Sequence, residues 1–308
     1  MRHFTSLENL SSQDFSDIFR LADEIRNNPL KFREVLSDKN IGLLFEKPSL
    51  RTRVSFQVGI NQLGGKVIYL SSAEVQLGKR EATSDVAKTL SKYLDGVILR
   101  TFSHNTFLEF IKSSTIPVIN GLTDLLHPVQ VLSDLYTIYK RKKKWKELKI
   151  SFIGDGNNVC NSLILGSAKL GLRLDIACPL GFEPDKDIVK RALKISQSSR
   201  AKIRILNNPK LAVKSSDVLY TDVWASMGKE EEAVFRRDIF KEFKVDSQLL
   251  RLAKKNCLVM HCLPAHRGEE ISEEVIDGRH SIVFEQAQNR LYVQKALLIW
   301  LFSKNHVL

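Results

Sequence analysis

Short runs of apolar and β-branched residues alternate along the chain with longer stretches in which apolar residues recur at helical spacing. The runs have the length of strands, and most of the intervening stretches are long enough for a helix. This alternation is typical of parallel sheets whose strands are connected by helices. The runs that we interpret as strands cover residues 41–46, 66–71, 96–101, 116–121, 149–155, 174–179, 202–207, 218–223, 258–264 and 281–285.

The predicted strands fall into two groups, separated by a helical pattern over residues 128–144. A chain of 308 residues, 43% of them hydrophobic, is long enough to bury two cores. We therefore expect an α/β protein with two doubly wound parallel-sheet domains linked by helices. Residues 1–136 would form the first domain and residues 137–286 the second. The last helical pattern, residues 287–308, would pack back on the first domain.

The chain shows no signal for a membrane or for secretion. Its longest apolar run, "ALLIWLF", is far too short to span a bilayer, and its N-terminus is polar without an apolar signal core. We therefore expect a cytoplasmic protein. The cysteines form no CxxC pair, and a chain of this length needs no disulfides, so we expect them to be reduced. They are Cys160, Cys178, Cys257 and Cys262.

The net charge of +12 is compatible with three classes of partner, namely nucleic acid, a membrane surface or an anionic small molecule. The densest basic run, residues 140–146, contains one aromatic residue and lies at the end of a helical pattern, where cations suit the helix dipole. We interpret it as a solvated helix end. The remaining charge is dispersed, which disfavours nucleic-acid binding and leaves anionic substrates.

Ligands of open α/β sheets bind beyond the carboxyl ends of the strands, so we examine those positions first. The first strand is followed by "KPSLRTR", residues 47–53, in which Ser49 is a good N-cap residue. Arg51 and Arg53 fall in the first helical turn, where the helix dipole disfavours cations. Free backbone N–H groups and guanidiniums together suit an anion, and phosphate fits best. The alternative is an ordinary capped helix with solvated arginines.

Polar groups at other strand ends of the first half extend this picture. Arg100 ends the third strand, although such an arginine alone is usually a surface ion pair. Pro128 fits the first turn of a helix, which puts His127 and Gln130 about one turn apart near its start. Together they could hold a small carbonyl compound, whereas His127 alone is more often a packing residue. Arg290 is another arginine at a helix start.

The turn "GDGNNV" after the fifth strand resembles a dinucleotide-binding turn. The motif would need glycine where Val159 stands, and the following strand ends without the acid that would bind a ribose. We therefore reject NAD as a cofactor. Asn157 and Asn158 remain as polar groups at a helix start.

Asp222, Ser226 and Gly228 fall in a turn after the eighth strand, and the ninth ends in "HCLPAH". His261 and Cys262 raise the possibility of zinc, but no second Cys/His cluster with ligand spacing exists, and neighbours in a strand face opposite ways. We therefore expect no metal. A Cys/His nucleophile is unsupported by the spacing but stays open.

Together these segments resemble the aspartate/ornithine carbamoyltransferase family, in the same order over nearly the whole chain. The Ser-Met-Gly turn and the cysteine before Leu263 resemble the ornithine branch rather than the aspartate branch. Two positions depart from the family pattern: Leu50 replaces a threonine of the phosphate motif, and Val129 replaces a cysteine. The matching segments are "SLRTR" (49–53), Arg100, "HPVQ" (127–130), "DVWASMG" (222–228), "HCLP" (261–264) and "NRL" (289–291).

The resemblance implies transfer of the carbamoyl group from carbamoyl phosphate to the δ-amine of L-ornithine, giving L-citrulline and phosphate in arginine metabolism, including arginine biosynthesis. It implies a carbamoyl phosphate-binding domain, an ornithine-binding domain and a homotrimer, or a multiple of it, with sites between subunits, without metal or organic cofactor. Three alternatives stay open: a carbamoyltransferase acting on putrescine or an N-acylated ornithine, a basic nucleic-acid-binding module, and an idle structural subunit.

The resemblance also assigns roles to residues. Gln76 would reach carbamoyl phosphate from a neighbouring subunit. The catalytic residues would be Arg100, His127, Gln130, Asp222 and Cys262. Carbamoyl phosphate would be bound by Ser49, Leu50, Arg51, Thr52, Gln76, Arg100, His127, Pro128, Val129, Gln130, Cys262, Leu263 and Arg290. Ornithine would be bound by Asn158, Asp222, Ser226 and Met227.

Overall fold

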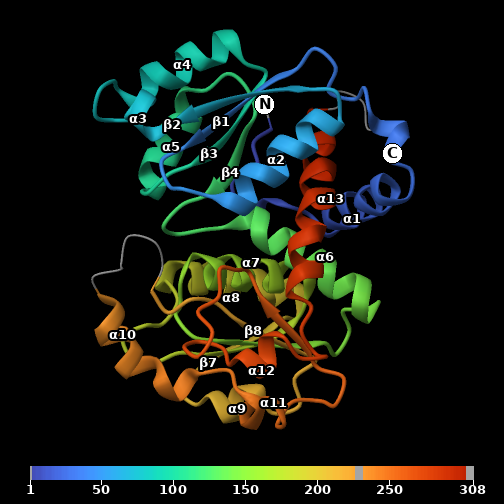
Figure 1. The fold of residues 1–308 in the computed structure, drawn as a ribbon, viewed down its shortest axis with the longest axis vertical. Coiled ribbons are helices and arrows are strands. Elements are labelled where there is room, and N and C mark those ends of the chain that lie inside the picture. Colours follow the sequence, from blue (N-terminus) through green and yellow to red (C-terminus); the bar gives the residue numbers. More distant parts are fainter. Residues whose placement is uncertain (1, 226–231, 303–308) are drawn as a thin grey trace. The chain divides into compact units, whose positions relative to one another are not determined.

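The computed structural model describes residues 2–225 and 232–302 (Figure 1). The chain forms two compact units. Unit 1 comprises Met1–Ser133 and Asn289–Leu308, and unit 2 comprises Asp134–Gln288. The chain passes from one unit to the other within α6 (Pro128–Lys142) and returns within α13 (Val283–Phe302). The sequence prediction placed these crossings after residues 136 and 286.

Unit 1 contains a parallel sheet with the strand order β2-β1-β3-β4. β1, β3 and β4 are buried almost throughout, because helices cover both faces, and this is why they read as continuous apolar runs. The strands are β1 (Asn40–Phe45), β2 (Lys66–Ser71), β3 (Gly96–Arg100) and β4 (Val118–Leu122). The helices are α1 (Ser12–Asn27), α2 (Leu50–Gln62), α3 (Ser72–Val75), α4 (Thr83–Tyr93) and α5 (His104–Ser113), with 3₁₀ turns at Leu7–Asn9 and Pro29–Phe32.

The C-terminal part of α13 packs on unit 1 beside α1 and α2, as predicted (Figure 1). The indole Nε1 of Trp300 donates a hydrogen bond to Asp14 in α1 at 3.2 Å, and Lys295 Nζ donates to Gln62 in α2 at 2.9 Å. These bonds hold the C-terminal part of α13 against α1 and against the end of α2.

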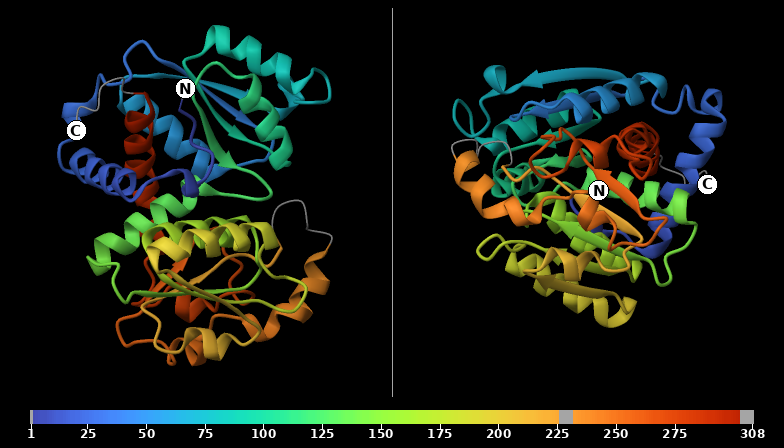
Figure 2. Two further views of the ribbon diagram at one scale, coloured as in Figure 1. Left: turned by 180° about the vertical axis from the view of Figure 1, so that it is seen from behind. Right: turned by 60° about the horizontal axis from the view of Figure 1, so that its bottom comes forward.

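Unit 2 contains a second parallel sheet, with the order β7-β6-β5-β8-β9 and helices on both faces (Figure 2). The strands are β5 (Lys149–Ile153), β6 (Arg173–Ala177), β7 (Lys202–Leu206), β8 (Val218–Thr221) and β9 (Leu258–His261). The helices are α7 (Asn158–Leu170), α8 (Lys186–Ser199), α9 (Pro209–Val213), α10 (Ala233–Phe240), α11 (Ser247–Leu250) and α12 (Glu273–Ile276), with a 3₁₀ turn at Lys241–Phe243.

Both sheets confirm the predicted α/β class with doubly wound parallel sheets. The strand order reverses between β1 and β3 in unit 1 and between β5 and β8 in unit 2. Such reversal points open a crevice at the carboxyl ends of the strands, where ligands bind in this class of fold.

The prediction of a tenth strand over residues 281–285 is wrong. Ser281 makes only an isolated parallel bridge with Val259, and α13 already begins at Val283. The run "SIVFE" is apolar and β-branched, but so short a run is equally compatible with the buried first turn of a helix. The terminal helix therefore starts four residues before the predicted residue 287.

None of the helices within residues 2–225 and 232–302 combines the length and apolarity that crossing a membrane requires. All four cysteines are free thiols. Burial raises the pKa of the Cys178 and Cys257 thiols to about 12, so these two are inert at neutral pH.

Candidate active site

Three adjacent strands of unit 1 deliver polar groups to one edge of the sheet. β1 leads into the start of α2, β3 ends in Arg100, and β4 is followed by His127 at the start of α6. Because β1, β3 and β4 are neighbours and parallel, their carboxyl ends lie together. The structure thus brings together the groups predicted from these strand ends.

The start of α2 is capped as predicted. Ser49 adopts an extended conformation, and its Oγ accepts a hydrogen bond from the backbone N–H of Thr52 at 3.2 Å. The side chain of Leu50 is exposed, so at this position only the backbone faces the helix start. The guanidinium of Arg53 lies 3.7 Å from the centre of the Tyr69 ring. Of the two predicted arginines, Arg51 is therefore the one that acts on the cluster described next.

Positive charges crowd around Arg100 and His127, which are both buried. Burial, and then the charges of Arg290 and Arg51, lower the pKa of Arg100 to about 10. Burial, followed by the charges of Arg290, Arg100 and Arg51, holds the pKa of His127 well below 6.5. His127 is therefore a neutral imidazole at neutral pH. A buried arginine whose pKa is lowered further by two neighbouring guanidiniums belongs to a site whose charge favours an anion.

Arg290 ties the C-terminal helix to this edge. Its Nη1 donates to the Oε1 of Gln130 and its Nη2 donates to the Oγ1 of Thr52, each at 2.6 Å, and all three side chains are buried. Arg100 Nε is buried and makes no hydrogen bond within the described part of the chain.

The other predicted carbamoyl phosphate residues of unit 1 occupy different surroundings. Pro128 is the first residue of α6, and Val129 is buried beneath it, which accounts for an apolar residue in place of cysteine. Gln76 is exposed on the segment that follows α3, with a left-handed φ of 45°.

In unit 2, Asp222 is the centre of a hydrogen-bond network at the ends of β5, β8 and β9. Its Oδ1 accepts from the Cys262 thiol and from the Val223 N–H, both at 2.9 Å. Its Oδ2 accepts from Asn157 Nδ2 at 2.8 Å. The buried carboxylate is thus fixed in place by three donors from three strand ends.

Asn157, which the sequence pointed to beside Asn158 without a binding role, is the residue of the two that contacts Asp222. Its Oδ1 caps α7 by accepting from the N–H groups of Val159 and Cys160, while its Nδ2 orients Asp222. The preference for asparagine at N-caps could have identified it. Asn158 is the half-buried first residue of α7, and Ser226 and Met227 lie outside the described residues.

The argument that His261 and Cys262 face opposite ways is wrong. The donor atoms of Asp222, His261 and Cys262 lie within 4.8 Å of one another, because β9 ends at His261 and strand alternation does not extend to Cys262. Both ring nitrogens of His261 are engaged, however, by the Leu263 N–H at 2.9 Å and by Glu270 at 3.1 Å. The side-chain atoms of Asp222, His261 and Cys262 that could bind a metal thus already take part in hydrogen bonds within the protein.

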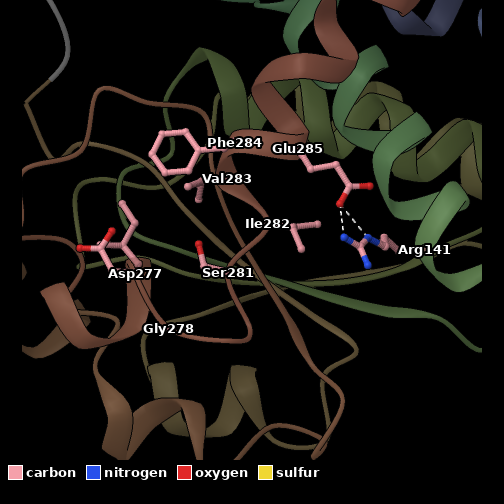
Figure 3. A pocket seen from close by; sticks show the side chains of 9 residues that line it. Arg141, Asp277, Gly278, Ser281, Ile282, Val283, Phe284 and Glu285 are labelled. Carbon is pink, nitrogen blue, oxygen red and sulfur yellow. Dashed lines mark hydrogen bonds and ion pairs between the residues drawn. The ribbon is translucent and has the colours of Figure 1, made fainter. Parts of the chain in front are cut away.

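Unit 2 also has a surface pocket of about 250 Å³ at the start of α13, which contains none of the predicted site residues (Figure 3). On one side, Arg141 and Glu285 pair with each other, with Nε and Oε2 at 2.8 Å. Phe284 is largely exposed at this pocket. With its cation already paired, the pocket lacks the anion-seeking character of the cluster around Arg100.

Comparisons with known proteins agree with this geometry. Residues 2–140 match the family model of the aspartate/ornithine carbamoyltransferase carbamoyl-P binding domain, and residues 146–301 match that of the Asp/Orn binding domain. An ornithine carbamoyltransferase of Bacillus cereus is 50% identical over 298 residues, which are 97% of this chain and 93% of that protein.

Solved structures give the same result. The ornithine carbamoyltransferase of Pyrococcus furiosus superimposes with a TM-score of 0.95 at 41% identity, covering 99% of this chain and 98% of that one. The anabolic ornithine carbamoyltransferase of Campylobacter jejuni superimposes with a TM-score of 0.93 at 40% identity, covering 99% and 100%.

Proposed function

Because this chain belongs to the aspartate/ornithine carbamoyltransferase family and is a carbamoyltransferase, we propose how its own residues transfer the carbamoyl group of carbamoyl phosphate to the δ-amine of L-ornithine. The products are L-citrulline and phosphate. The observation that carries the assignment of the phosphate site is the clustering in unit 1 of Arg51, Arg100 and Arg290, whose charges act on one another around the buried His127.

In this proposal the phosphate of carbamoyl phosphate binds at the start of α2. The backbone N–H groups at the helix start and the positive end of the helix dipole suit a dianion. Arg51 and Arg100 add positive charge, and Arg290 supports the site through Thr52. The dianion relieves the repulsion among these groups, so part of the binding free energy comes from the empty site itself.

His127 and Gln130 bind the carbamoyl end. A neutral imidazole donates one N–H to the carbonyl oxygen without competing for the phosphate, and the depressed pKa of His127 keeps it in that form. Arg290 accounts for one lone pair of Gln130 Oε1. In this proposal Gln130 Oε1 also accepts a hydrogen bond from the carbamoyl NH₂ group.

Transfer needs no covalent intermediate. The neutral δ-amine attacks the carbonyl carbon and forms the new C–N bond, while the carbonyl oxygen becomes negative and is stabilised by Arg100 and His127. The C–O bond then breaks, its electron pair leaves with phosphate, and the departing phosphate takes the proton that the amine loses. Ornithine must be deprotonated at the δ-amine to react, so the rate rises with pH until that amine is neutral.

Ornithine binds to unit 2. The carboxylate of Asp222 pairs with an amino group, and Asn158, Ser226 and Met227 orient the α-carboxylate end. Cys262 donates its S–H to Asp222, and in this proposal it orients the substrate rather than attacking it. Leu263 offers its backbone beside Cys262.

The test is citrulline formation from carbamoyl phosphate and ornithine, with putrescine and N-acetylornithine as alternative amines. Arg51→Ala should lose most activity, and Arg53→Ala is the matched control because that guanidinium lies on Tyr69. Normal activity of Arg51→Ala would overturn the phosphate assignment. Faster turnover of putrescine or N-acetylornithine than of ornithine would overturn the choice of amine.

We also propose that the protein is a cytoplasmic homotrimer that works in arginine biosynthesis. In this trimer, Gln76 of one subunit completes the active site of a neighbouring subunit. The exposed position of Gln76 supports this role. Gln76→Ala and Arg51→Ala subunits should each be inactive alone. Mixed trimers should regain activity, because some sites then combine an intact Arg51 with an intact Gln76. No recovery in verified mixed trimers would exclude shared sites.

A further inference from the structure

The chain after β9 folds back so that Glu270 lies against the side chain of His261. Both residues are fully buried, and Nε2 of His261 lies 3.1 Å from Oε1 of Glu270. We propose that Glu270 and His261 are a positioning pair that fixes the backbone of Cys262 and Leu263 for the amine substrate. The inference rests on the proposed function and adds residues to it that touch no substrate.

The hydrogen bonds assign the proton of His261. The backbone N–H of Leu263 donates to Nδ1 at 2.9 Å, so Nδ1 carries a lone pair and the ring hydrogen sits on Nε2. Nε2–H therefore donates to Glu270. A carboxylate at this place favours that tautomer, as carboxylates do when they orient imidazoles that act as metal ligands or catalytic bases.

Leu263 is the residue that needs this support. Its φ of 59° is left-handed, a conformation that is unfavourable for leucine. The N–H to Nδ1 hydrogen bond offsets this cost and holds the turn. Cys262, immediately before it, donates to Asp222 at 2.9 Å. The conformation of Leu263 therefore decides whether the thiol of this turn faces the Asp222 carboxylate and whether its backbone faces the substrate amine.

Hydrogen bonds within the surrounding chain hold Glu270 beside His261. The N–H of His266 donates to its Oε1 at 2.6 Å, and the turn closes through the Gly268 N–H and Ile271 O at 2.9 Å. The left-handed φ of Gly268, +92°, suits glycine. On the other side, Gln286 Oε1 accepts from the His261 backbone N–H at 3.0 Å. His261 is thus fixed through its backbone and its ring.

Burying the carboxylate of Glu270 in this position costs free energy. Its Oε2 is buried and makes no hydrogen bond to any residue that the structure describes. Burying such an oxygen without a partner is unfavourable. A carboxylate retained despite that cost, with its other oxygen on the ring of His261, points to a role in orienting the imidazole rather than to stabilisation of the core.

Two substitutions of His261 separate the two ring nitrogens. In His261→Asn, the side-chain oxygen replaces Nδ1 and still accepts from Leu263. In His261→Gln, the amide nitrogen replaces Nε2 and still donates to Glu270, but the acceptor for Leu263 is lost. We expect KM for ornithine to rise less than about threefold in His261→Asn and about tenfold or more in His261→Gln. Glu270→Gln should raise it by an intermediate factor.

The measurement is steady-state kinetics for both substrates, together with calorimetric binding of inorganic phosphate and a melting temperature. Phosphate affinity should be unchanged in all three variants, because the phosphate cluster lies in unit 1. The controls are His266→Asn and Glu273→Gln, both exposed, which should match the wild type. If Glu270→Gln does not fold, the comparison of the two His261 variants decides alone.

Equal ornithine KM values for His261→Asn and His261→Gln would overturn the proposal. So would losses of phosphate affinity and melting temperature that account for the whole effect, because they would indicate a structural role only. A wild-type protein that forms no citrulline would instead overturn the proposed function. The two failures are therefore distinguishable.

Discussion

Arg290 and Thr52 lie 238 positions apart in the chain, yet Nη2 of the arginine donates to Oγ1 of the threonine at 2.6 Å. Thr52 belongs to the first turn of α2, where we place the phosphate. The last helix of the protein therefore supports the first turn of another helix, through a hydrogen bond between two buried side chains.

Thr52→Val tests this relationship, since it keeps the shape of the side chain and removes the acceptor. One N–H of the buried Arg290 then lacks its partner, and we expect carbamoyl phosphate to bind roughly tenfold more weakly. KM for carbamoyl phosphate and the affinity for inorganic phosphate should change together. Thr115→Val, at an exposed threonine, is the control. Wild-type phosphate affinity in Thr52→Val would show that Arg290 acts independently of Thr52.

The pKa of about 10 for Arg100 predicts an alkaline limit to anion binding. A dianion binds the protonated guanidinium, and this group begins to lose its proton as the pH rises through about 10. The dissociation constant for phosphate should then increase by about tenfold per pH unit above that value. Calorimetry between pH 8 and pH 11 measures it. Arg100→Gln should bind weakly at every pH and lose this dependence; an identical dependence in the variant would assign it to another group.

His127 predicts a loss of stability on the acid side. The fold favours the neutral imidazole, whereas the unfolded chain binds a proton near the ordinary value of 6.5. Below that pH the unfolded state takes up the proton and the free energy of unfolding falls, by at most about 1.4 kcal/mol per pH unit. Above it, His127 contributes no pH dependence.

Urea unfolding at pH 5.5 and 7.5, at one protein concentration, compares the wild type with His127→Asn. Other histidines titrate in both proteins, so the difference isolates His127. The variant should show the smaller loss in acid. Equal losses would mean that His127 becomes protonated in the folded protein.

Two substitutions of Cys262 should weaken ornithine binding to different extents. Cys262→Ser retains a hydroxyl that can donate to Asp222, whereas Cys262→Ala removes the donor. KM for ornithine should rise roughly tenfold in the alanine variant and less in the serine variant. Thiol alkylation should block ornithine binding and leave phosphate binding intact. Unchanged ornithine affinity in Cys262→Ala would remove Cys262 from the site.

A substitution at Gly96 tests how tightly the C-terminal helix α13 packs on unit 1. A Cβ at this position would lie 2.2 Å from the ring of Phe302, so Gly96→Ala forces the ring to move. We expect a loss of about 1–3 kcal/mol of stability. The double variant with Phe302→Leu should recover part of it, which thermal unfolding measures against Phe302→Leu alone. Full additivity of the two losses would show that they do not interact.

The ends of the predicted strands were the feature of the sequence that located the candidate site. Apolar runs in a βαβ order placed Ser49, Arg100 and His127 at the carboxyl ends of parallel strands, and the strand order made those ends adjacent. What the runs could not distinguish was a buried strand from the buried start of a helix, which is why residues 281–285 were misassigned. A single apolar run carries no periodicity long enough to decide.

Contacts set by loop geometry were beyond the reach of the pattern. Glu270 reaches His261 only because the intervening turn doubles back, and nothing in "HCLPAHRGEE" specifies that path. Arg53 was grouped with Arg51 by spacing, yet its guanidinium lies on Tyr69, a residue of the neighbouring edge strand. Asn157 differs from these cases, since N-cap preference alone was enough to find it.

The crowded cations around Arg100 have a consequence for selectivity and turnover. Any dianion relieves their repulsion, so charge cannot distinguish carbamoyl phosphate from the inorganic phosphate that the reaction releases. Discrimination rests on the small, uncharged end of the substrate, through His127 and Gln130. The enzyme should therefore be subject to strong product inhibition by phosphate, competitive with carbamoyl phosphate, and departure of phosphate becomes a natural candidate for the slow step of each cycle.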